Sequence, residues 1–87
     1  MPTLHLLNKT TQLSNCLMFL SADDVLVLSG AAVQLVLTPD QLTNLNYYVL
    51  SEDLSARGLS ALVSEESQIS MEDFVKLICS FDRQVAW

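Results

Sequence analysis

Short apolar runs alternate with helix-type segments along this chain, and this alternation limits the folds open to it. Residues 3–7, 25–28 and 47–50 are rich in Leu, Val and Tyr, and the last two runs contain no charged or small polar residue. Continuous runs of this length are typical of strands buried on both faces. Because helix signals follow each run, the sequence predicts an α/β fold with a mostly parallel sheet flanked by helices on both faces.

The segments between these runs differ in how clearly they predict structure. Apolar residues at three- and four-residue spacing predict helices over residues 11–21 and 71–80. Residues 31–37 fit a helix or a strand equally well. Residues 60–69 are polar in the middle, so any strand there is brief, and residues 85–87 are expected to form a last edge strand.

Helix-capping residues mark several of the expected boundaries. Thr38, followed by proline and by Gln41, predicts a capping box, and residues 70–73 predict a second one. Ser51 is expected to cap the helix that follows the run at 47–50. Gly58 is expected to end that helix in a left-handed conformation.

Composition indicates a small subunit rather than an independent protein. The chain has 87 residues, of which 51% are hydrophobic and only 16% are charged. A chain of this length forms one domain, here residues 1–87, and it cannot bury so many apolar side chains alone. Exposed apolar surface usually serves partner binding, so we expect the chain to belong to an assembly.

The charge pattern and the motifs that are missing exclude several function classes. The net charge is −6, and the four basic residues are scattered, so direct nucleic-acid binding is not expected. No apolar run is long enough for a membrane span, and we expect neither a secretory signal nor a disulfide framework, which predicts a cytoplasmic protein. No metal-ligand cluster, phosphate loop, cofactor motif or Ser-His-Asp pattern is found.

Three residues carry the chemistry that a thiol or acid–base function would need. Cys16 shares a helix face with leucines, which predicts a buried and inert thiol rather than a sulfur carrier. Cys79 has Lys76 and Arg83 at helical spacing, which would favour a thiolate, although an incidental surface cysteine is the simpler interpretation. His5 is the only histidine, and without a partner it is expected to be a hydrogen-bonded structural residue.

Three further residues are candidates for a partner interface. Asp53 and Arg57 lie four residues apart on one expected helix, where they either pair with each other or leave Arg57 to bind a partner. Trp87 is either a core residue or an interface anchor, a role in which tryptophan is common.

Motifs along the whole chain resemble the TusB/DsrH family of sulfur-relay subunits. The family patterns Asp-Leu-x-Ala-Arg-Gly-Leu and Asp-Phe-Val-x-Leu are present at residues 53–59 and 73–77, and the family's Ala-Trp ending is present at residues 86–87. Leu-His at residues 4–5 and the cysteine at position 16 resemble the opening and the first helix of DsrH-type members. Residue 29 departs from the pattern, because serine replaces the usual aspartate.

The resemblance implies a fold, partners and a role. The implied fold is a small DsrE-like three-layer α/β sandwich. The implied partners are TusC-like and TusD-like subunits in a heterohexamer, which receives persulfide sulfur and passes it through a TusE-like carrier for 2-thiolation of tRNA wobble uridine. In that complex the sulfur-carrying cysteine belongs to another subunit, so this chain would be a non-catalytic accessory subunit without a cofactor.

Two alternatives remain open at this point. The first is a DsrH-type subunit of a DsrEFH complex in dissimilatory sulfur oxidation, in which Cys16 would carry sulfur. The second is a free-standing thiol carrier protein that uses Cys16 or Cys79.

Overall fold

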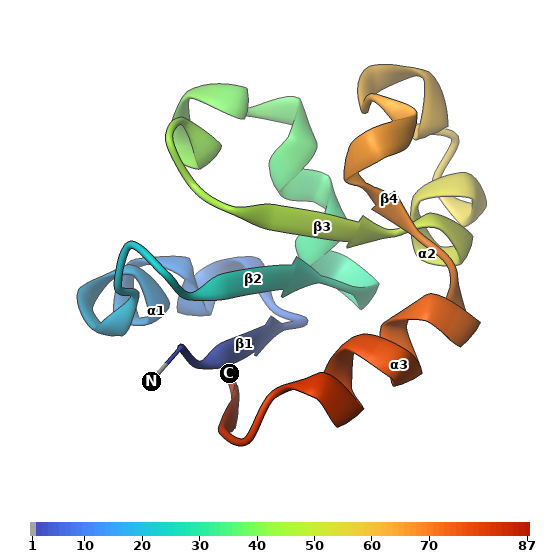
Figure 1. The fold of residues 1–87 in the computed structure, drawn as a ribbon. Helices are drawn as coiled ribbons and strands as arrows, with labels where there is room; N and C mark the ends of the chain where they lie inside the picture. Colours follow the sequence, from blue (N-terminus) through green and yellow to red (C-terminus); the bar gives the residue numbers. More distant parts are fainter. Residues whose placement is uncertain (1) are drawn as a thin grey trace.

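A five-stranded sheet forms the centre of the protein in the computed structural model, which describes residues 2–87 (Figure 1). The strands lie in the order β4-β3-β2-β1-β5, and every neighbouring pair is parallel. Their bounds are β1 (Leu4–Leu7), β2 (Val25–Leu28), β3 (Tyr47–Leu50), β4 (Gln68–Ile69) and β5 (Gln84–Ala86). The predicted α/β fold with a parallel sheet and flanking helices is therefore confirmed.

Helical segments connect all of the strands. Three are α-helices: α1 (Leu13–Phe19), α2 (Ser51–Ala56) and α3 (Met71–Ser80). Five are short 3₁₀ helices: η1 (Thr10–Gln12), η2 (Gly30–Leu37), η3 (Pro39–Leu42), η4 (Ser60–Leu62) and η5 (Glu65–Ser67). The ambiguous segment 31–37 is thus helical, and the brief strand expected in residues 60–69 is β4.

The direction of the connections decides which face each helix covers. From β1 to β4 the chain moves across the sheet one strand at a time, and it then returns past all four strands to place β5 beside β1. Right-handed crossovers that run in opposite directions lie on opposite faces of a sheet. Accordingly, α3 passes alone on one side of the sheet, while α1, η2 and α2 lie on the other (Figure 1).

The main core lies between the sheet and the helices on the α1 side. Leu7, Leu26, Leu28 and Val49 point to this face and are at most 1% exposed. They pack against buried side chains from α1, η2, η3 and α2, among them Cys16 and Leu54. This continuous cluster holds α1, η2, η3 and α2 against the sheet.

The opposite face of the sheet is covered less completely. Leu4, Val27 and Leu50 point to this face and are buried, but no residue of α3 is buried. Met71 and Val75, which belong to the predicted apolar face of this helix, are 43% and 52% exposed. One helix is too narrow to cover a face of five strands, so part of its apolar surface stays in contact with solvent.

Two of the predicted helix boundaries form as expected. The Ser70 hydroxyl accepts a hydrogen bond from the Asp73 amide at 3.1 Å and caps α3. Gly58 has a φ of 70°, and the Leu59 amide bonds to the Leu54 carbonyl, which closes α2 with a Schellman motif.

Two predicted caps are wrong. The Thr38 hydroxyl donates back to the Leu35 carbonyl at 3.2 Å, because it lies at the end of η2 as well as at the start of η3, so no capping box forms. Ser51 is already the first helical residue of α2, and Leu50 occupies the cap position without a side-chain hydrogen bond.

Candidate functional site

A hydrogen-bonded group of His5, Asp24 and Trp87 joins the starts of β1 and β2 to the end of the chain. The His5 imidazole lies 3.0 Å from the Asp24 carboxylate through Nε2, and the Trp87 indole donates from Nε1 to His5 Nδ1 at 3.1 Å. The two rings stack at a centroid distance of 6.2 Å. His5 is 2% exposed and Asp24 is 4% exposed, so the group is shielded from water on most sides.

Asp24 is held by three donors just before β2. The amides of Thr3 and Ser21 donate to its carboxylate at 2.8 and 2.9 Å, and the third donor is His5. Burial alone would raise the pKa of this carboxyl, but the amide hydrogen bonds and the His5 contact outweigh burial and lower the pKa below its usual value of 3.8. Asp24 is therefore a stable anion that fixes the starts of β1 and β2.

These contacts fix the hydrogen-bonding pattern of His5. An ionised carboxylate only accepts hydrogen bonds, so Nε2 carries the ring proton, and the indole donates to an unprotonated Nδ1. Both ring nitrogens are thus used inside the protein. Within the described chain, no hydrogen bond links His5 to Cys16 or to the Ser21 hydroxyl.

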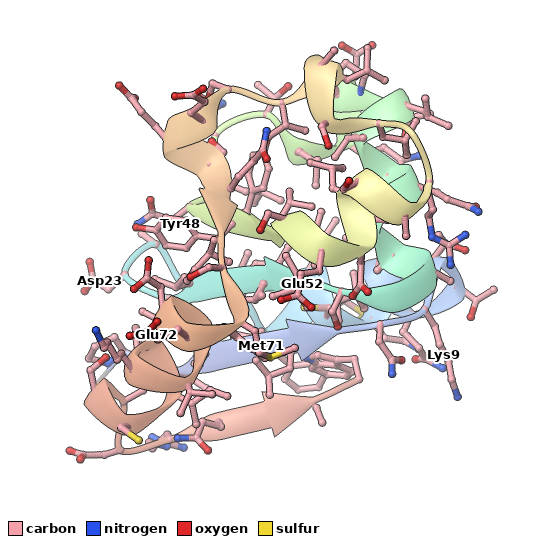
Figure 2. The ribbon with its side chains drawn as sticks, turned by 90° about the vertical axis from the view of Figure 1, so that its right-hand side faces the viewer. Lys9, Asp23, Tyr48, Glu52, Met71 and Glu72 are labelled. Carbon is pink, nitrogen blue, oxygen red and sulfur yellow. The ribbon has the colours of Figure 1, made fainter. Side chains whose placement is uncertain are left out.

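A pocket of about 450 Å³ opens over this group at the amino-terminal ends of β1, β2 and β5. Figure 2 marks this end of the sheet with Asp23, while Lys9, just after β1, lies at the other end. The lining includes Phe19, Arg83, Val85 and Trp87, and the Phe19 and Trp87 rings stack at 5.6 Å. Open parallel sheets usually hold small ligands at the carboxyl ends of their strands, so this position is unusual for a substrate pocket.

Cys16 lies on the side of α1 that faces the core. It is 0% exposed and belongs to the core cluster, as its helix face predicts. Burial, together with the negative charge of Asp24, raises the pKa of its thiol to about 11. At neutral pH this cysteine is therefore protonated and out of reach of a sulfur donor.

Cys79 differs from Cys16 in its surroundings. It lies on α3, is exposed, and forms no disulfide. Lys76, one of the two cations expected near it, has its ammonium 3.6 Å from Glu72.

Of the two alternatives for Asp53 and Arg57, pairing with each other does not form within residues 2–87. The Asp53 carboxylate instead accepts the Gly30 amide at 2.8 Å and ties the start of α2 to the end of β2. Arg57 is exposed and forms no ion pair within residues 2–87, so its proposed role in partner binding stays a prediction. Trp87 is half-buried, packs against the main core and also lines the pocket.

The partners of His5 are the functional feature that sequence reasoning missed. Asp24 directly precedes the second apolar run, and parallel pairing of β1 with β2 brings it beside the start of β1. That register could have suggested the contact. The contact to Trp87 spans 82 positions and depends on where the last strand is placed in the sheet.

Two structural features of other protein classes are not found in residues 2–87. The described part of the chain contains no group of three His, Cys, Asp or Glu side chains that could hold a metal ion. Over the same residues, every helix is too short or too polar to cross a lipid bilayer.

The fold and the site together define a class of protein. The chain has a parallel α/β sheet and exposes large apolar side chains, a feature typical of proteins that bind partners. The family model described as "DsrH like protein" matches residues 8–84, and the chain belongs to this family. A comparison with curated proteins gives no match. Family membership supports a role as a subunit in sulfur relay.

Proposed function

We propose that this chain is a non-catalytic accessory subunit of a TusBCD-like sulfur relay that supports 2-thiolation of tRNA wobble uridine in the cytoplasm. The burial of Cys16 is the observation on which the accessory role rests. Persulfide transfer needs an accessible thiolate, whereas this thiol is 0% exposed and has a pKa of about 11. The sulfur would therefore be carried by a cysteine of another subunit.

The surface of the chain supports an accessory role within an assembly. Large apolar side chains are exposed on several elements, with Met18 at 79%, Phe19 at 66%, Leu62 at 59% and Leu37 at 58%. We propose TusC-like and TusD-like subunits as the partners that cover them, in a heterohexamer, with an indirect link to a TusE-like carrier. The net charge of −6 fits a subunit that does not contact tRNA itself.

The second candidate function is a DsrH-type role in dissimilatory sulfur oxidation. It is favoured by the presence of a cysteine at position 16, where DsrH-type members carry one. In that role a partner would have to displace α1 and expose the thiol before sulfur could reach it.

The test is to express the chain together with TusC-like and TusD-like neighbours from the same genome and to change Cys16 to alanine. Alanine removes the sulfur without adding a buried hydroxyl and costs about 1 kcal/mol of stability. Intact-complex mass measurement reports assembly, and nucleoside analysis of tRNA reports thiolation in cells. Cys79→Ala serves as the matched control, because it removes an exposed thiol.

Three results are distinguishable. A complex of all three subunits with unchanged tRNA thiolation in the Cys16→Ala variant supports the accessory role. Assembly without thiolation would make Cys16 a sulfur carrier and would contradict that role. Failure of the wild-type chain to assemble with these partners would contradict both relay functions and favour the free-standing thiol carrier.

A further inference from the structure

Strand β5 presents an open edge to solvent. It pairs only with β1, through bonds that include Leu4 amide to Arg83 carbonyl at 2.9 Å and Trp87 amide to Leu6 carbonyl at 2.8 Å. Main-chain groups alternate in direction along a strand, so the amides and carbonyls of Gln84 and Ala86 point away from β1. All residues of β5 are exposed, and the next strand position in the sheet is empty of this chain's own residues within 2–87. Such an edge is a template for one more strand.

The pocket lies along the same edge, and its β5 side is apolar. Val85 lies on β5 and Trp87 directly follows this strand, two residues further on, so both share the face of the sheet that Phe19 borders. Trp87 Nε1 is bonded to His5 Nδ1, so Trp87 presents its ring to the β5 side of the pocket, while the polar residues Thr3, Ser21 and Asp24 line the side toward β1 and β2. Phe19 is 66% exposed and Val85 is 38% exposed. The Phe19, Val85 and Trp87 side of the pocket suits a large apolar or aromatic side chain.

Arg83 adds a charge to the rim of the pocket. It lies two residues before Val85 and therefore shares its face, and it is exposed. Within residues 2–87 its guanidinium forms no salt bridge, although the chain carries ten acidic residues. An arginine at an apolar rim is well suited to bind a carboxylate from another chain.

We propose that β5 receives an extended segment of a partner subunit, which adds a sixth strand to the sheet. The segment places one large apolar or aromatic side chain into the pocket of Phe19, Val85 and Trp87, and it places a carboxylate on Arg83. Because side chains on one face recur every second residue, the acidic and the apolar residue are two or four positions apart in the segment. This inference rests on the proposed function as a subunit of a relay complex and identifies the surface that the partner occupies.

The experiment uses the complex of the full chain with its TusC-like and TusD-like neighbours. Ala86→Pro removes an amide that points away from β1 and leaves the β1–β5 bonds in place. Arg83→Glu reverses the rim charge, and Phe19→Ser removes the exposed ring. Leu62→Ser, on η4, removes a side chain of similar exposure (59%) away from the pocket and is the matched control. Thermal unfolding of each isolated variant checks that it is folded.

Each of the three test variants is expected to weaken assembly at least about tenfold, with Leu62→Ser close to wild type. Hydrogen exchange provides a measurement that needs no variant: the amides of Gln84 and Ala86, which point away from β1, should exchange at least about tenfold more slowly in the complex than in the free chain. A complex without this protection, or one that forms equally well with all four variants, overturns the inference and leaves the proposed function standing. Failure of the wild-type chain to form any complex overturns both.

Discussion

Replacing Asp24 with asparagine should destabilise the protein far more than a change of one charge on the surface would. The carboxylate accepts from Thr3, Ser21 and His5 at 2.8, 2.9 and 3.0 Å. An asparagine side chain offers only one acceptor oxygen, and its NH₂ group faces a donor. In either orientation of the amide, at least one main-chain N–H loses its acceptor.

The size of the effect follows from the lost contacts. A hydrogen bond to a charged acceptor contributes about 1.5–3 kcal/mol, and the two amides concerned are partly buried, so we expect a loss of about 2 kcal/mol. For a chain of this length that corresponds to a fall in melting temperature of about 10 °C. Urea unfolding followed by circular dichroism and by the fluorescence of Trp87, the only tryptophan, measures it.

The pH dependence gives the prediction a second, independent test. The pKa of Asp24 is lower in the folded protein than the ordinary 3.8, so its contribution to the free energy of unfolding is complete above pH 3.8 and is lost as the pH falls through the folded value. The difference between wild type and Asp24→Asn should therefore be constant near neutrality and shrink in strong acid. Asp23→Asn, at the exposed neighbouring position, is the control. Equal unfolding midpoints for the two variants at pH 7 would refute the reasoning.

Three other experiments test the core, a helix end and the thiols. Leu28→Ala, at a 0% exposed position, should cost about 2–5 kcal/mol in urea unfolding, and a loss below about 1 kcal/mol would show a loosely packed core. Gly58→Ala should cost about 1 kcal/mol because φ is 70°, while the added methyl group meets no atom within 4 Å, so an unchanged midpoint would contradict the assigned conformation. An aromatic disulfide reagent at pH 7 should modify Cys79 and leave Cys16 unmodified until urea unfolds the chain, and rapid modification of both thiols in the folded protein would show that Cys16 is accessible.

The spacing of apolar residues predicted a strand and a helix correctly. The run at Val25–Leu28 is a strand with the same bounds in the structure, because continuous apolar residues between polar ones leave little choice of boundary. The helix over Met71–Ser80 and its Ser70 cap are also as predicted. The caps at Thr38 and Ser51 are wrong, because a hydroxyl at a helix boundary has several local acceptors and donors to choose from.

Contacts between distant segments could not be predicted in the same way. Asp53 binds the Gly30 amide instead of Arg57, since the end of β2 and the start of α2 meet at one edge of the sheet. An exposed ion pair contributes only a few tenths of a kcal/mol to stability. The hydrogen bond from the partly buried Gly30 amide to Asp53 is therefore the stronger interaction.

The amino-acid sequence by itself determined the α/β class, the parallel sheet, the burial of Cys16 and the family, because all of these follow from apolar periodicity and short motifs. Only the tertiary structure decided that His5 lies between Asp24 and Trp87, and that the expected edge strand pairs with β1 and lies beside a pocket. Those features depend on the return of the chain past four strands to the free side of β1. Strand order is set by packing among all elements at once, and no local stretch of sequence contains that information.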